Sequence, residues 1–251
     1  MVSNYPYNIF SLSDQAITID FGNIISDAIN DVVISLFKHL QQHPVEGMIE
    51  AVPAYSSLTI YYDMITLRKK VPEEKSVFDW IKSEVSRLFQ QKEDIVQVKE
   101  KLVSIPVCYE KEFASDIQQA STQLQIPVEE IIRIHTSKTY RVYMLGFLPG
   151  FAYMGEVDDA IALPRKPQPV QVEAGSVGIA GKQTGVYPFN SSGGWQIIGK
   201  TPINMFNKSE KELTALKAGD RIKFYSISVD EFIFLKTTPP LPQERGLGGE
   251  V

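Results

Sequence analysis

The stretch from His135 to Phe206 is dense in glycine, proline and aromatic residues and has almost no helical periodicity. Glycine leaves the backbone without a side chain and proline fixes φ, so this density predicts tight turns and loop walls instead of long regular elements. Aromatic side chains set among such turns can line a pocket, where small-molecule sites usually lie. We therefore expect the functional site in this part of the chain.

The length and composition favour two modest globular domains. At 251 residues the chain is near the size at which chains often divide, and its hydrophobic share of 43% is ordinary for a globular protein. The net charge of −5 and the pI near 5.4 give no sign of a nucleic-acid partner.

The cellular location is predicted from the absence of paired cysteines, of a signal peptide and of a membrane-spanning segment in the sequence. The single Cys108 excludes an internal disulfide, and its place in an apolar, β-branched run predicts a buried thiol. The first residues have neither a basic region nor an apolar core of signal-peptide length, and no run of about 18 apolar residues occurs. We expect a cytoplasmic protein with no membrane contact.

Residues 1–95 are predicted to form a small α+β sandwich domain. Apolar residues at spacings of three and four predict helices, and short β-branched runs closed by turn residues predict strands. The predicted strands are Ala16–Phe21, Met48–Ala54 and Ser57–Tyr62, and the predicted helices are Ile25–Leu40 and Val77–Phe89.

The polar, mixed-charge stretch Gln90–Lys101 marks the expected domain boundary. Residues 96–240 are predicted to form a β-barrel domain, because short apolar runs there alternate with turn signals, and residues 241–251 a loose tail. The elements expected at the start of this domain are a strand at Leu102–Cys108, helices near Phe113–Leu124 and Pro127–Ile134, and a strand at Tyr140–Phe147.

Residues Gly194–Thr201 satisfy the phosphate-loop pattern G-x-x-x-x-G-K-S/T, which would place Lys200 on phosphates. A phosphate loop follows a buried strand and opens a helix, whereas here the turn residues SSGG precede WQII and Pro202 follows the pattern. The residues between the two glycines of the pattern look like a strand, so we interpret the match as accidental.

The turn Gly146–Phe151 is a candidate binding element. Two Gly-Phe units around Pro149 can offer backbone N–H groups together with aromatic faces, which suits a planar amide or a carboxylate. The alternative is a barrel corner whose phenylalanines fill the core. Polar residues on neighbouring turn-rich segments favour the first interpretation. The substrate-binding candidates are Phe147, Gly150, Phe151, Arg165, Lys182, Gln183, Tyr187 and Asn190.

His135 and Arg141 are the catalytic candidates. His135 is the only histidine outside the first domain, so it is the natural group for proton transfer near neutral pH, although a lone histidine at a helix end is more often a cap. Arg141, like Arg165, could hold a carboxylate or phosphate by paired hydrogen bonds. With one cysteine and no HExxH-type spacing, no metal site is expected, and Ser176 lacks the G-x-S-x-G elbow of a nucleophile.

Six blocks in order make the chain resemble the KipI/PxpB family, which is also described as allophanate hydrolase subunit 1 and as a carboxyltransferase subdomain. They are LSDQAITIDFG near the N-terminus, SSLTIYYD, GFLPGFAYMG, LPR, AGSVGIAGKQTGVYP and GGWQIIGKTP. The resemblance implies an α+β domain followed by a cyclophilin-like β-barrel. Its family-matching site positions are His135, Arg141, Arg165, Gln183 and Tyr187.

The resemblance also implies an activity, that of the B-type subunit of an ATP-dependent 5-oxoprolinase, which opens 5-oxo-L-proline to L-glutamate. Its implied partners are a PxpC-like carboxyltransferase subunit and a LamB/YcsF-type subunit, and ATP is expected in the complex. Two alternatives stay open, a KipI-like inhibitor of a sensor histidine kinase and a urea carboxylase or allophanate hydrolase-type component. The chain departs from the family pattern at Val170, Glu173 and Ser192, where an arginine and two prolines are expected, and the missing arginine weakens the catalytic expectation for that loop.

Overall fold

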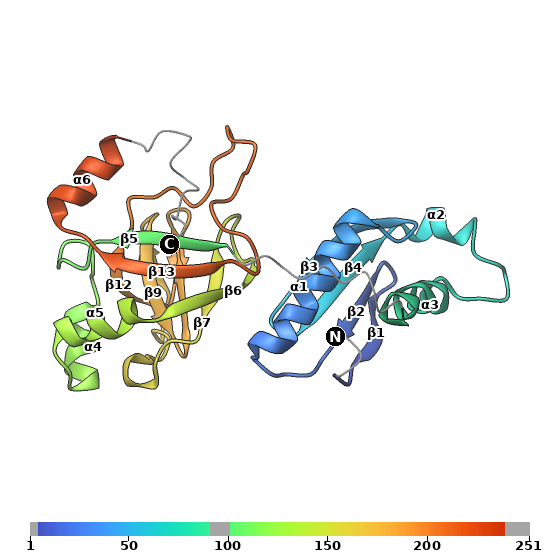
Figure 1. The fold of residues 1–251 in the computed structure, drawn as a ribbon, viewed down its shortest axis with the longest axis horizontal. Coiled ribbons are helices and arrows are strands. Elements are labelled where there is room, and N and C mark those ends of the chain that lie inside the picture. Colours follow the sequence, from blue (N-terminus) through green and yellow to red (C-terminus); the bar gives the residue numbers. More distant parts are fainter. Residues whose placement is uncertain (1–4, 91–100, 239–251) are drawn as a thin grey trace, which may run out of the picture. The chain divides into compact units, whose positions relative to one another are not determined.

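The computed structural model describes residues 5–90 and 101–238, in two compact units that divide between Lys99 and Glu100 (Figure 1). The predicted boundary between residues 95 and 96 and the predicted tail lie outside the described residues. Within the described part of the chain, no helix is long and apolar enough to cross a bilayer.

The first unit is an antiparallel four-stranded sheet in the order β1-β2-β4-β3. Its elements are β1 (Asn8–Ser13), β2 (Ala16–Asp20), α1 (Asp27–Gln42), β3 (Met48–Pro53), β4 (Ser57–Tyr62), α2 (Met64–Arg68) and α3 (Val77–Gln90). The apolar stripes of α1 and α3 join the sheet residues Ile17, Ile19, Leu58 and Ile60 in one core, as the periodicity predicts. The predicted strands and helices are thus present, and the mostly exposed edge strand β1 and the short helix α2 are the additions.

The second unit is built on a seven-stranded sheet in the order β12-β9-β10-β7-β6-β13-β5. Its strands are β5 (Leu102–Val107), β6 (Thr139–Leu145), β7 (Ala152–Gly155), β9 (Ser176–Ala180), β10 (Gln183–Val186), β12 (Gln196–Lys200) and β13 (Arg221–Ser226). A separate ribbon pairs β8 (Val170–Val172) with β11 (Ser191–Gly193), and the helices are α4 (Ile117–Leu124), α5 (Val128–Ser137), the 3-10 turn η2 (Asp159–Ile161) and α6 (Val229–Thr237). The α+β class with a C-terminal barrel-type sheet is confirmed.

The sheet curls until its two edge strands meet at one bridge. Cys108 and Lys200 exchange backbone hydrogen bonds of 2.8 and 2.9 Å, which join the end of β5 to the end of β12. Gly199 permits this approach, because a Cβ there would lie 2.6 Å from Val107 Cγ1. The register of β12 also shifts between Ile197 and Gly199. The interpretation of the phosphate-loop match as accidental is therefore supported, since Gln196–Lys200 is a strand.

The strand register gives the sheet two chemically different faces. Val142, Met154 and Thr184 lie opposite one another on β6, β7 and β10 and face the enclosed core. Because side chains alternate along a strand, their neighbours point to the other side of the sheet, which we call the outer face. The predicted site residues on β6 and β10, Arg141 and Gln183, belong to the outer face.

Candidate functional site

A row of polar residues crosses the outer face. Arg141 on β6 pairs with Gly155 on β7, which pairs in turn with Gln183 on β10, and Arg221 on β13 lies opposite Arg141. Gly155 has no side chain, and the space where its Cβ would lie is bordered by the Tyr143 ring, with Cε2 at 3.6 Å. The Arg141 side chain is 1% exposed, so it lies beneath the surface of this face.

Four aromatic rings pack together farther along the same face. The ring centroid of Phe151 lies 4.8 Å from that of Tyr153, 5.2 Å from that of Tyr187 and 5.3 Å from that of Trp195. The three pairs meet edge to face, which is the favoured geometry for aromatic rings. We call Phe151, Tyr153, Tyr187 and Trp195 the aromatic cluster; it forms a small apolar layer outside the barrel core.

Glycines on the strands make room for these rings. A Cβ on Gly185 would lie 3.0 Å from Trp195 Cζ3, and a Cβ on Gly178 would lie 3.1 Å from Trp195 Cβ. A Cβ on Gly193 would lie only 2.3 Å from the Tyr187 hydroxyl oxygen. The glycines of this region therefore serve close packing of aromatic rings as well as turns.

The turn Gly146–Phe151 combines both predicted roles. Phe151 is buried in the aromatic cluster, as the barrel-corner alternative expects, whereas Phe147 is 61% exposed. Phe147 has a φ of 67°, a value that bulky residues rarely adopt, and such strain often marks functional segments. Gly150, with φ 85°, packs against Met205, where a Cβ would lie 2.9 Å from the carbonyl oxygen. The turn thus presents one aromatic ring outward and anchors the other.

Arg165 lies near the aromatic cluster, because the N–H of the next residue, Lys166, donates to the Gly194 carbonyl oxygen beside Trp195 at 2.7 Å. Burial raises the pKa of Tyr153 and of Tyr187, and the Arg165 charge opposes that rise in both. The Arg165 side chain is itself exposed. A cation next to aromatic rings can bind a small anion that carries a flat ring.

His135 lies in the core and not at this face. Its side chain is 0% exposed and stacks on Phe224 with centroids 4.7 Å apart. Thr184 donates its hydroxyl proton to the Gly178 carbonyl oxygen, so His135 Nε2 donates to Thr184 Oγ1 at 3.0 Å and Nδ1 accepts from the Tyr109 hydroxyl at 2.7 Å. Burial lowers the pKa of His135 to about 3. This placement supports a structural role and does not support the predicted proton transfer.

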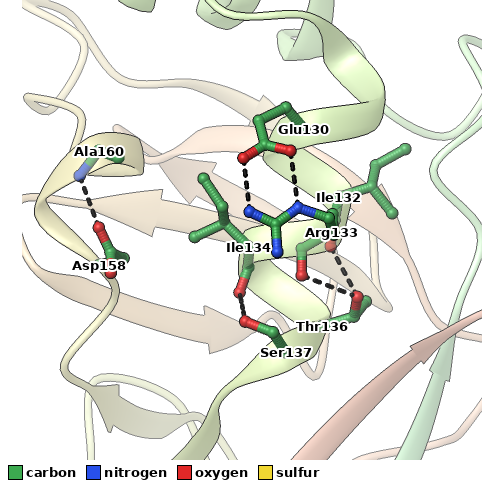
Figure 2. A network of polar contacts seen from close by, with 8 residues as sticks. All are labelled: Glu130, Ile132, Arg133, Ile134, Thr136, Ser137, Asp158 and Ala160. Carbon is green, nitrogen blue, oxygen red and sulfur yellow. Dashed lines mark hydrogen bonds and ion pairs between the residues drawn. The ribbon is translucent and has the colours of Figure 1, made fainter.

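On the exposed side of the same helix, the polar side chains make hydrogen bonds within the helix. On α5, Arg133 makes hydrogen bonds of 2.7 and 2.6 Å to the two carboxylate oxygens of Glu130, as Figure 2 shows. Thr136 and Ser137 donate their hydroxyl protons to backbone carbonyls one turn earlier. Because these polar groups are satisfied within the helix, the exposed side of α5 offers no evident ligand site.

Two further candidates have local structural partners. The Lys182 ammonium pairs with Asp159 at 2.6 Å, and Asn190 Oδ1 accepts the Ala174 backbone N–H at 2.8 Å. Both contacts are to residues outside the aromatic cluster. Among the described residues, no group of three histidine, cysteine, aspartate or glutamate side chains is placed to hold a metal ion.

The residues that depart from the family pattern lie around the β8–β11 ribbon. Val170 is exposed on β8, Ser192 lies on β11 opposite Gln171, and Glu173 forms an ion pair with Lys200. The ammonium group that the phosphate-loop pattern would place on phosphates is therefore held by a carboxylate of this loop.

Sequence reasoning missed Tyr153, Trp195, Asp116 and Lys166 as members of the site. The first two complete the aromatic cluster, and the Asp116 carboxylate pairs with Lys166 at 2.6 Å next to Arg165. Alternation along β7 places Tyr153 on the same face as Gly155, but the pairing of Gly155 with Arg141 and Gln183 needs the strand register, and Trp195 lies just before β12 where no such pattern applies. No local pattern links Asp116 to Lys166, which lie 50 positions apart.

Known proteins match nearly the whole chain. A family model described as "Carboxyltransferase domain, subdomain C and D" matches residues 7–216. The chain is 42% identical to the B-type subunit of 5-oxoprolinase from Bacillus subtilis (strain 168), over 90% of this chain and 95% of that protein. It is 34% identical to the corresponding 5-oxoprolinase subunit of Haemophilus influenzae, over 86% and 96%. The crystal structure of TTHA0988 matches with TM-score 0.72 and 32% identity, over 85% of this chain and 40% of that longer chain.

Proposed function

Because this chain belongs to the family of the carboxyltransferase domain, subdomain C and D, we propose that it is the B-type subunit of an ATP-dependent 5-oxoprolinase. In this proposal the assembly hydrolyses 5-oxo-L-proline to L-glutamate, and the chain is inactive without its partner subunits. The observation that carries the proposal is the 42% identity to a B-type 5-oxoprolinase subunit over 95% of that protein's length. A second relative of the same name matches over 96% of its length.

The outer face supplies chemistry that suits this substrate. 5-Oxoproline is a small five-membered lactam with one carboxylate, so a site for it needs a cation and a flat apolar wall. Arg165 provides the cation, and Tyr153, the partly exposed ring of the aromatic cluster, provides apolar surface near it. The turn Gly146–Phe151, with exposed Phe147, borders the same cluster and is the proposed wall for the lactam ring.

The catalytic step needs help beyond this chain. An unactivated lactam opens slowly, and ATP in the complex would supply the activation of the amide oxygen. Arg141 and Gln183 are the outer-face candidates for stabilising charge that develops there. The Gly194–Thr201 segment offers no phosphate cradle, because it contains a strand and its Lys200 is paired with Glu173. We therefore assign no ATP-binding residue to this chain.

Reconstitution tests the proposal. The chain is mixed with a PxpC-like carboxyltransferase subunit, a LamB/YcsF-type subunit, ATP and 5-oxoproline, and glutamate is measured over time. The complete mixture should produce glutamate, and omission of this chain should abolish production. Equal turnover without it would contradict the proposal.

The same purified chain separates the two alternatives. A kinase inhibitor would suppress histidine-kinase autophosphorylation in a stoichiometric complex, whether or not 5-oxoproline is present. A urea carboxylase-type component would support carboxyl transfer to urea and no glutamate formation.

A further inference from the structure

A short segment at Leu163–Pro167, which we call the strap, is tied down on both sides of Arg165. The Leu163 carbonyl oxygen accepts the Gly181 N–H at 2.6 Å, and the Lys166 N–H donates to the Gly194 carbonyl oxygen at 2.7 Å. Gln196 lies opposite Ile179 in the β12–β9 pair, so Gly194 and Gly181 lie at the same end of these strands. The strap therefore crosses that end of the sheet.

A shielded ion pair holds the strap on the C-terminal side of Arg165. Lys166 Nζ lies 2.6 Å from Asp116 Oδ2, and the two side chains are only 17% and 12% exposed. The same Asp116 oxygen accepts the Ile197 N–H at 2.6 Å, while the Asp116 N–H donates to the Ile197 carbonyl oxygen at 2.9 Å. Asp116 is thus held by β12 and holds Lys166 in turn. A pair this shielded resists salt screening better than a surface pair does.

A side-chain hydrogen bond holds the strap on the N-terminal side of Arg165. The Gln196 side-chain amide donates to the Pro164 carbonyl oxygen at 3.0 Å. The residues before and after Arg165 are therefore both bonded to the chain around the start of β12, where Trp195 of the aromatic cluster also lies. This arrangement fixes the direction in which the exposed Arg165 side chain leaves the backbone.

We propose that Asp116 and Lys166 are positioning residues that aim the Arg165 guanidinium at the carboxylate of 5-oxoproline next to Tyr153, the partly exposed ring of the aromatic cluster. This inference rests on the proposed function of the chain. Neither residue touches the ligand. Their contribution is preorganisation: a guanidinium that is already held in place loses less conformational freedom when it binds an anion.

The test uses the complete three-subunit assembly and steady-state kinetics in both substrates. Lys166→Met keeps the alkyl stem and removes the charge, and Asp116→Asn keeps an oxygen that can accept the Ile197 N–H. Each should raise the KM for 5-oxoproline about five- to tenfold, with kcat and the KM for ATP changed less than about twofold. Lys166→Arg should restore most of the affinity. Arg133→Met, which breaks the ion pair on the exposed side of α5, is the matched control and should change neither KM.

A double variant shows whether the ion pair acts through Arg165. If it does, Lys166→Met should add nothing to the KM increase already caused by Arg165→Ala, because coupled residues are not additive. Additive effects, an increase in the KM for ATP alone, or unchanged KM in both ion-pair variants would overturn the inference while leaving the proposed function in place. A wild-type assembly that forms no glutamate would instead contradict the proposed function and the ligand named here together.

Discussion

The Tyr109 hydroxyl and the Nδ1 atom of His135 lie 2.7 Å apart inside the barrel core, where the imidazole has no exposed surface. The hydroxyl can donate to Nδ1 only while that nitrogen carries no proton. The neutral imidazole is therefore part of the folded structure, and protonation would break this bond and place an unpaired charge in the core.

The first prediction is a pH dependence of stability that originates at His135. Burial lowers its pKa from 6.5 to about 3 in the folded protein, so between these values the unfolded chain binds a proton that the folded chain does not. The free energy of unfolding should hence be fully retained above pH 6.5 and fall as the pH drops toward 3, by at most about 1.4 kcal/mol per pH unit from this group. Urea unfolding at several pH values measures the slope. His135→Gln should be less stable at pH 7 and show a shallower slope, and equal slopes would contradict the assignment.

The second prediction compares two adjacent glycines. Gly193→Ala should destabilise the protein by about 1–3 kcal/mol, because the new methyl group would lie 2.3 Å from the Tyr187 hydroxyl oxygen. Gly194→Ala is the control, since its nearest contact would be an ordinary 3.6 Å. Thermal unfolding of both variants provides the comparison, and similar melting temperatures would count against the packing described for the aromatic cluster.

The third prediction concerns the closure of the barrel. Gly199→Ala should destabilise the protein by about 1–3 kcal/mol, because its Cβ would lie 2.6 Å from Val107 Cγ1 and 3.0 Å from the Cys108 carbonyl oxygen. Val107→Ala removes the nearest of these atoms. The double variant should therefore lose less stability than the sum of the two single variants, as chemical denaturation can show. Strict additivity would mean that the two positions do not meet.

The fourth prediction is the effect of Arg165 on turnover. In the reconstituted assembly, Arg165→Ala should raise the KM for 5-oxoproline about 10- to 100-fold, because a charge-assisted hydrogen bond to the carboxylate is lost. Arg165→Lys should recover only part of the affinity, since an ammonium group cannot bind a carboxylate in a bidentate manner. Glutamate formation at varied 5-oxoproline gives both values. An unchanged KM would remove Arg165 from the site.

The helices and most strands follow from local patterns, but the site does not. The spacing in Asp27–Gln42 and the β-branched run in Ser57–Tyr62 predict their structures because burial of one face decides them. Strand β1 is the exception, because Phe10 and Leu12, which alternate with serines, are exposed and burial of one face does not decide its structure. Whether His135 has a structural or a catalytic role depends on whether its hydrogen-bond partner Thr184 faces the core or the outer face. That follows from strand register, which is a long-range property. The pairing of Asp116 with Lys166 likewise arises only when α4 meets β12.

The bridge between Cys108 and Lys200 closes the barrel at a point where the chain also has a free cysteine, which can report on opening of this seam between the two edge strands. Backbone hydrogen bonds of 2.8 and 2.9 Å cross this seam, and the chain's single cysteine, with a thiol pKa raised by burial, lies at the same point. A thiol reagent can reach that sulfur only when the surrounding structure opens, so the rate of Cys108 labelling in native buffer measures how often it does. The unmodified protein therefore carries its own probe of local opening, with no label to introduce.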